Sequence, residues 1–364
     1  GSGNYISRSL GDRNGGEADK SAATAFFTAL IIGILITIVG LTFLRPLVFL
    51  LGATETIAPY AMDYGIYILI AAPFMMSSFV MNNILRAQGN AMYSMIGITA
   101  GGILNMILDP VLIFGFHMGI AGAAVATMVS QMISFGILFY QCNFREGSIR
   151  LRLANFTPTW KMYGEILHAG LPSFCRQGLA SVATVILNFA AGPFGDSAIA
   201  AMSIVSRFMM FINSALIGFG QGFQPVCGFN YGAGRYDRVR EGFRFCVAIT
   251  AIFLTLMSVA FFIFSSPVLS FMQRSSEDGA GREAVNIAVK ILRRQLISLP
   301  LMSFVVMSNM MLQTMGKVVP ASLLAASRQG MCFLPAILLL PPLFGMTGVE
   351  IAQSVADVLS FALA

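Results

Sequence analysis

The feature that most constrains this chain is a series of long apolar segments separated by short polar connections. A helix needs about 20 apolar residues to cross the roughly 30 Å hydrocarbon core of a bilayer. Segments of this length occur at 22–44, 60–85, 92–116, 119–141, 163–190, 197–228, 242–264, 287–312, 318–341 and 346–364. They lack the period of two that barrel strands show, and backbone groups in lipid must be satisfied within the segment. The chain is therefore predicted to be an all-α polytopic membrane protein.

Composition and charge placement agree with a multi-pass protein of the cell (inner) membrane. Only 10% of the residues are charged and the mean hydropathy is +0.79, whereas soluble domains carry about 25% charged residues. The net charge of +6 does not indicate nucleic acid, because most Lys and Arg lie in alternate connections. Such an excess marks cytoplasmic loops. We expect 142–161 and 229–241 to face the cytoplasm and 265–286 to face outside.

Two halves of the chain repeat each other in three ordered blocks, at offsets of 221, 227 and 226 residues. The matched residues are Gly1 and Gly11 with Gly222 and Gly232; Pro73, Met75, Asn82, Leu85 and Gly89 with Pro300, Met302, Asn309, Leu312 and Gly316; and Gly119, Gly122, Ala126 and Val129 with Gly345, Gly348, Ala352 and Val355. Nearly constant offsets in one order predict an internal duplication.

The duplication predicts an N-lobe at 1–141, a cytoplasmic inter-lobe linker at 142–162 and a C-lobe at 163–364. By the same offsets, the N-lobe lacks the first helix and most of the second, and the last helix is slightly truncated. The complete protein is expected to have twelve helices in two six-helix lobes, with about ten and a half to eleven of them here. A pseudo-twofold axis along the membrane normal should relate the lobes. This architecture suits a secondary transporter, and we expect a monomer.

Polar residues in the segment NMILDP (105–110) form the first candidate site. Asn105 and Asp109 are four residues apart and so share a helix face, while Thr127 reaches a similar depth on the next segment. Their oxygens suit a small hard cation or an exchangeable proton. Alternatively, Asp109 caps a helix that restarts with Pro110. The second half lacks equivalents of Asn105 and Asp109, so the fold itself does not require these two residues.

The second half carries basic residues inside its apolar segments. Intramembrane charges are costly and usually face a cavity or one another. Residues that could line a substrate pathway are Arg176, Gln177, Arg207, Gln221 and Gln224. The alternative is internal neutralisation, for instance of Arg207 by Asp357, whose estimated depths in the membrane match.

Four segments resemble the multidrug and toxic compound extrusion (MATE) family, in its bacterial MepA-like branch. They are RAQGN (86–90), LNMILDPVLIF (104–114), GIAGAAVATMVSQ (119–131) and GFGQGFQPVCGFNYGAGRYDRVREGF (218–243). The resemblance implies an antiporter that exports organic, multidrug-type compounds in exchange for H+ or Na+. It maps the family's N-lobe cation site, a candidate Na+ site, onto Asn105, Asp109 and Thr127. The family's acidic residues of helices seven and ten are not found here.

Other classes of function have less support. No GxxxxGK[ST] phosphate loop, HExxH pair or nucleophile–base set occurs in the sequence, so we expect neither an enzyme nor a cofactor other than the coupling ion. The remaining alternative is a lipid-linked oligosaccharide flippase of related architecture, whose basic cavity would use Arg176, Arg207 and Arg328. The expected partners are organic small molecules and the lipid bilayer.

Overall fold

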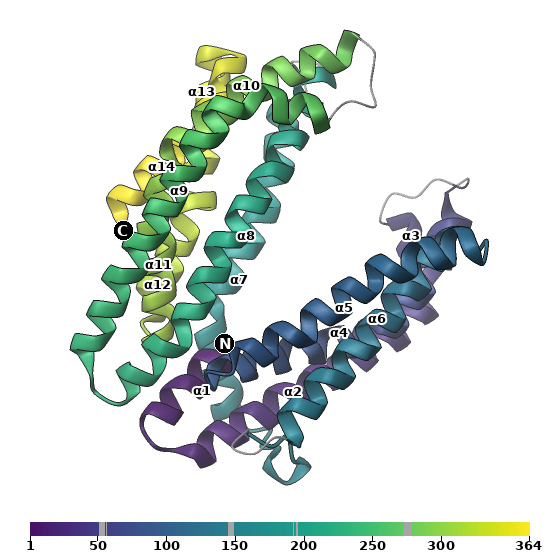
Figure 1. Ribbon diagram of the computed structural model, residues 1–364, viewed down its shortest axis with the longest axis vertical. Coiled ribbons are helices and arrows are strands. Elements are labelled where there is room, and N and C mark those ends of the chain that lie inside the picture. The colour runs from purple at the N-terminus through teal and green to yellow at the C-terminus, as the bar shows by residue number, and fades with distance from the viewer. Residues whose placement is uncertain (51–54, 56, 145–148, 192, 194–195, 273–278) are drawn as a thin grey trace. The chain divides into compact units, whose positions relative to one another are not determined.

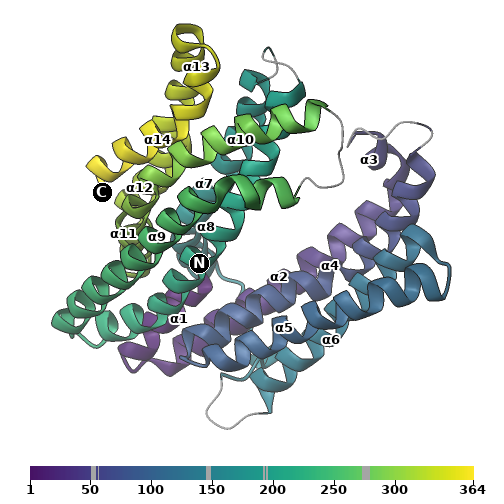
Figure 2. The same cartoon turned by 45° about the horizontal axis from the view of Figure 1, so that its top comes forward.

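The computed structural model describes residues 1–364 except 51–54, 56, 145–148, 192, 194–195 and 273–278. Its chain divides into two compact helical units, one formed by Ser2–Ile166 and the other by Leu167–Ala364 with Gly1. The described residues contain helices and no strand, as Figures 1 and 2 show. The boundary between the units falls inside one helix, α7.

The predicted apolar segments appear as helices with slightly wider bounds. In the first unit the elements are α1 (Ser2–Gly11), α2 (Gly15–Thr42), α3 (Leu44–Leu50), α4 (Ala58–Ala87), α5 (Ala91–Pro110), the π-helical turn η1 (Val111–Gly115), α6 (Gly119–Asn143) and the 3-10 turn η2 (Leu153–Asn155). Those that follow are α7 (Trp160–Ala191), α8 (Asp196–Gly232), α9 (Tyr236–Met272), α10 (Gly279–Ser298), η4 (Leu299–Leu301), α11 (Met302–Thr314), α12 (Val318–Ala326), the π-helical turn η5 (Ser327–Cys332), α13 (Phe333–Phe344) and α14 (Met346–Leu363).

Nine helical segments within the described residues are long and apolar enough to span a membrane. The predicted segment 163–190 is helical as part of α7 but is not among these nine. The predicted segments 287–312 and 318–341 are each continuous, built from α10, η4 and α11 and from α12, η5 and α13. These findings confirm the all-α polytopic fold. Part of the predicted outer connection, 273–278, and part of the linker, 145–148, lie outside the described residues.

Small residues let helices of the first unit approach closely, beside a core of large apolar side chains that includes Met81 and Leu85. In α2, Gly33 lies against Pro73 of α4, where a Cβ atom would come within 2.5 Å of the proline Cα. The large apolar side chains of α2, such as Leu35 and Ile38, are more than half exposed. This distribution is that of a membrane helix, because lipid solvates large apolar groups and small residues let helices approach closely.

The internal duplication is visible in the local structure of the two units. The backbone N–H of Asn14 donates to Ser9 O, and that of Arg235 donates to Asn230 O, both at 2.8 Å. The side chains of Asn82 and Asn309 each donate to a backbone carbonyl twelve residues further on. Gly119 and Gly345 both have φ near +60°, at 55° and 59°. Each pair is related by the offset that its sequence block shows. The relation of the lobes by an axis along the membrane normal stays a prediction.

Candidate functional site

In the first unit, Asn105 joins Asp109 and Thr127 into one polar cluster. Its Nδ2 donates to Asp109 Oδ1 at 3.2 Å, within α5, and to Thr127 Oγ1 at 3.4 Å, across to α6. The Thr127 hydroxyl donates to the carbonyl of Ala123 at 3.0 Å. All three polar side chains are half-buried. The structure thus brings together the three residues that the sequence singled out, with Asn105 as the bridge.

Glycines place the cluster by letting α5 and α6 approach closely on both sides of it. A Cβ on Gly101 would lie 2.8 Å from the Ser134 Cβ, and one on Gly122 would lie 2.9 Å from the backbone of Leu112. Ser134 Oγ also donates to Gly97 O at 2.8 Å. These contacts hold the two helices near enough for Asn105 to reach Thr127, which a large residue at either glycine would prevent.

The alternative in which Asp109 caps a helix that restarts at Pro110 is wrong. The α-helix continues through Pro110 and widens into the π-helical turn η1, and no side chain caps that turn. Proline has no N–H for the preceding turn, and a wider turn is one way a helix absorbs that loss. Asp109 is therefore not a helix cap, which removes the structural alternative for its carboxylate.

The cluster has the groups needed to exchange a proton or hold a small cation. It combines one carboxylate with an amide and a hydroxyl, which are hard oxygen ligands when their oxygens face the ion. In the present arrangement Asn105 turns its N–H groups toward both oxygens. A half-turn of this amide would present its oxygen to the ion instead.

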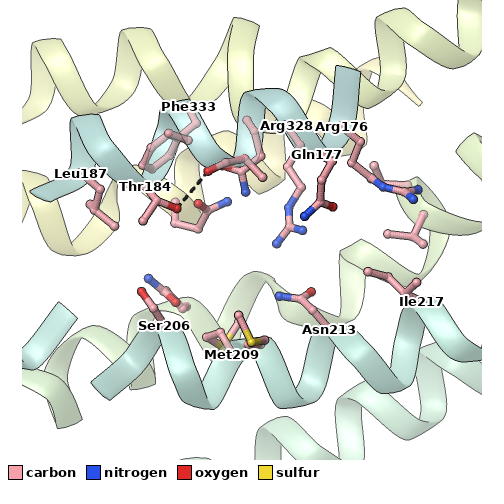
Figure 3. Close-up of a pocket in the computed structure, with 18 of the residues that line it drawn as sticks. Arg176, Gln177, Thr184, Leu187, Ser206, Met209, Asn213, Ile217, Arg328 and Phe333 are labelled. Atoms are coloured by element: carbon pink, nitrogen blue, oxygen red, sulfur yellow. Dashed lines mark hydrogen bonds between the residues drawn. The ribbon is translucent and has the colours of Figure 1, made fainter. Parts of the chain in front are cut away.

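The second unit contains a cavity of about 460 Å³. Figure 3 shows Arg176, Gln177 and Thr184 of α7 along one wall and Ser206, Met209 and Asn213 of α8 along the other. Arg328, Gln329 and Phe333 of the η5–α13 segment and Gln353 of α14 complete the lining. Several lining residues remain exposed, among them Gln177 and Ser206, so the cavity is open on one side.

A buried carboxylate behind this cavity orients one of its arginines. Asp357, whose side chain is 1% exposed, accepts from Arg328 Nε and from Gln353 Nε2, both at 2.9 Å. Its second oxygen accepts from Ser298 Oγ at 3.3 Å. Because Nε is the arginine atom that faces Asp357, the far end of the guanidinium points into the cavity, toward Asn213 (Figure 3).

The predicted pairing of Arg207 with Asp357 was wrong. Asp357 pairs with Arg328, and Glu350 pairs with Arg294, while Arg207 is exposed on α8. Matched depth placed two residues at one level of the membrane but did not show which helix faces they share. Both acids are therefore neutralised inside the unit, Asp357 by Arg328 and Glu350 by Arg294.

Of the five predicted pathway residues, Arg176 and Gln177 line the cavity. Arg207, Gln221 and Gln224 are not part of its lining, and their role in a pathway stays a prediction. Sequence reasoning missed Asn213 and the Gln353–Asp357 pair. The latter could have been found, since it repeats the i,i+4 amide–carboxylate spacing of Asn105 and Asp109, and Gln353 matches Thr127 at the offset of 226.

The sequence matches a protein family over most of its length. A family model described as MatE matches residues 1–111 and 172–338. Multidrug export protein MepA of Staphylococcus aureus is 30% identical over 360 residues, which are 98% of this chain and 77% of that protein. The protein of the same name from Staphylococcus haemolyticus is 29% identical over the same shares of both chains.

Solved structures share the fold. A crystal structure of MATE in complex with MaL6 matches 99% of this chain and 80% of its own, with a TM-score of 0.92 and 24% identity. A MOP superfamily transporter from Pyrococcus furiosus covers the same shares, with a TM-score of 0.92 and 23% identity. At these identities the structural likeness is evidence for the fold, and the sequence match is the evidence for the family.

Proposed function

This chain belongs to the MatE family of multidrug efflux transporters, and we propose that it is a secondary antiporter exporting organic compounds in exchange for H+ or Na+. It is a multi-pass membrane transporter and not an enzyme. The relatives named Multidrug export protein support organic, drug-like compounds as the exported class. The observation that carries the choice of antiport is the cluster of Asn105, Asp109 and Thr127, since an intramembrane carboxylate marks an ion pathway by default.

The proposed coupling residue is Asp109. Its carboxyl group accepts the hydrogen bond from Asn105, and the same amide nitrogen also donates to Thr127 on α6. Protonation, or a bound Na+, removes the need for that donor and frees the amide to turn. A change in the charge of Asp109 therefore changes the polar link between α5 and α6, which is how ion binding biases a helix pair toward one arrangement.

The test compares isosteric variants of two acids in the intact protein, reconstituted in liposomes. Asp109→Asn keeps size and hydrogen-bonding capacity but cannot ionise. We expect it to abolish efflux of ethidium and of naphthoate, each driven by an imposed pH or Na+ gradient, with expression unchanged. Asp63→Asn is the control, because Asp63 is an exposed acid of α4 and should transport like the parent.

The two gradients, applied separately, identify the coupling ion. Transport by Asp109→Asn at the parental rate would refute coupling through this carboxylate, because the variant lacks the only group at this position that can ionise. Loss of transport in both variants would show that the requirement for an acid is not specific to Asp109, and the assignment to Asp109 would fail.

A lipid-linked oligosaccharide flippase is the second candidate. Two arginines, Arg176 and Arg328, line the cavity of the second unit, and such cations suit a pyrophosphate group. An assay for movement of a fluorescent polyprenyl pyrophosphate across the same liposomes discriminates between the two functions. Under the antiporter proposal this lipid does not move, with or without an ion gradient.

A further inference from the structure

The cavity in the second unit has an unusual charge for a site inside membrane helices. Arg176 and Arg328 line it, and no carboxylate is among its described lining residues. Asp357 lies behind the wall and neutralises one of the two cations. Among the described residues, no acid pairs with Arg176. The cavity therefore keeps about one uncompensated positive charge.

We propose that this cavity is the binding site for the anionic group of an amphiphilic organic compound, a carboxylate or a similar oxyanion attached to an apolar body. The proposal rests on the proposed export function for its physiological setting, since the occupant would be the exported compound. It adds the charge class of the substrate, which the family match does not supply for this chain.

Charge complementarity favours an anion as the occupant of this cavity. A half-buried arginine such as Arg176 is costly without a counter-charge unless water or a ligand solvates it. A guanidinium offers a fork of N–H donors that matches a carboxylate better than any other side chain does. Arg176 supplies this fork with no competing carboxylate in the lining.

The orientation of the Arg328 side chain also favours an anion. Arg328 is held by its Nε atom against Asp357, which two further donors, Gln353 and Ser298, also fix in place. Its terminal N–H groups are left pointing into the cavity beside Gln177 and Asn213 (Figure 3). Asp357 is thus a positioning residue, and the arginine is pre-oriented for a ligand oxygen.

Size and lining select an amphiphile over a simple ion. At about 460 Å³ the cavity is in the range of small-molecule sites, which span about 300–1,000 Å³. Apolar side chains also line the cavity: Leu187 and Phe333 lie away from Arg176, and Ile217 lies on the wall opposite it (Figure 3). An oxyanion would sit at the two arginines and an aromatic body against these apolar side chains.

The first experiment compares three probes that share one ring system but differ in charge. Naphthoate, naphthol and naphthyltrimethylammonium are measured by equilibrium dialysis against the intact protein in a neutral detergent. We expect naphthoate to bind about tenfold or more tightly than naphthol, because hydrogen bonds to a charged group favour it by that factor. The quaternary ammonium compound should bind more weakly than naphthol.

The decisive variant is Arg176→Gln, since it breaks no ion pair among the described residues. It should weaken naphthoate binding about tenfold and change naphthol binding by less than about twofold. Arg328→Gln combined with Asp357→Asn removes both charges of the buried pair and should weaken naphthoate similarly. Arg238→Gln, at an exposed position of α9 outside the cavity, is the matched control.

Binding is measured without an ion gradient, so its outcome is independent of the coupling proposal. Equal affinity for the three probes, or naphthoate binding that Arg176→Gln leaves unchanged, would overturn the anion site even if ethidium efflux succeeds. Absence of efflux of both ethidium and naphthoate, together with charge-selective binding, would instead refute the transport proposal alone.

A lipid headgroup is the other source of the same chemistry. The measurement is therefore repeated in phosphatidylcholine nanodiscs with and without phosphatidylglycerol. Competition by phosphatidylglycerol would assign the site to a lipid phosphate, and its absence would assign it to a free amphiphilic anion. Either result supports an oxyanion site, provided that Arg176→Gln weakens the binding that is observed.

Discussion

Replacing Asp357 with alanine tests how much the second unit depends on its buried ion pair. The carboxylate is 1% exposed and accepts hydrogen bonds from Arg328, Gln353 and Ser298. Asp357→Ala leaves the Arg328 charge without its partner and Gln353 without this acceptor, whereas the Ser298 hydroxyl keeps the Gln295 carbonyl at 3.1 Å. Breaking a buried pair on one side costs about 3–5 kcal/mol.

The structure places the expected cost at the lower end of that range. The Arg328 side chain is 18% exposed and reaches an open cavity, so water can solvate the guanidinium once Asp357 is gone. We therefore expect a loss of about 3 kcal/mol in the free energy of unfolding. Removing both charges with Arg328→Met and Asp357→Leu should cost much less, because apolar replacements of a buried pair are often close to neutral.

The assay is a double-mutant cycle measured by unfolding in mixed micelles of rising dodecyl sulfate content. A coupling free energy of about 2 kcal/mol between Arg328 and Asp357 is the expected result. The pair of Lys20 and Glu17 is the control, since its side chains are 48% and 37% exposed at a separation of 3.2 Å. Solvent screening should reduce the coupling of such a pair to less than about 0.5 kcal/mol. Additive losses at Arg328 and Asp357 would refute the reasoning.

Two further predictions concern packing and topology. Gly122→Ala should destabilise the first unit by about 1–3 kcal/mol and weaken ion-coupled transport, because its Cβ would lie 2.9 Å from the Leu112 backbone. Gly136→Ala in the same helix should be neutral or stabilising, because its Cβ meets nothing within 4 Å. Thermal unfolding in detergent compares the two variants, and equal effects would contradict the packing argument. A cysteine placed at Arg150 of a cysteine-free protein should react with an impermeant maleimide only after the cells are opened; labelling of intact cells would reverse the predicted orientation.

The apolar segments could be predicted from the sequence because their cause is local. Transfer of a run of about 20 residues into lipid depends on that run alone. Each predicted segment is helical, and nine of the ten correspond to helices that are long and apolar enough to span a membrane among the described residues; 163–190 is the exception. The internal duplication could also be predicted from the sequence. Its matched glycines, such as Gly119 and Gly345, have a positive φ that few other residues adopt. Asn105 and Asp109 could be placed on one face because the period of a helix is known.

Contacts between helices were not determined in this way. Depth along the membrane can be counted from the sequence, but the rotation of each helix about its axis cannot, and it is set by packing. That is why Arg207 matched Asp357 in depth while Arg328 is its partner, and why Asn105 proved to be the residue that reaches Thr127. Pro110 alone is compatible with a broken helix or a widened turn. The close contact of Leu112 with Gly122 on the neighbouring helix accompanies the widened turn, and such a contact exists only in the folded structure.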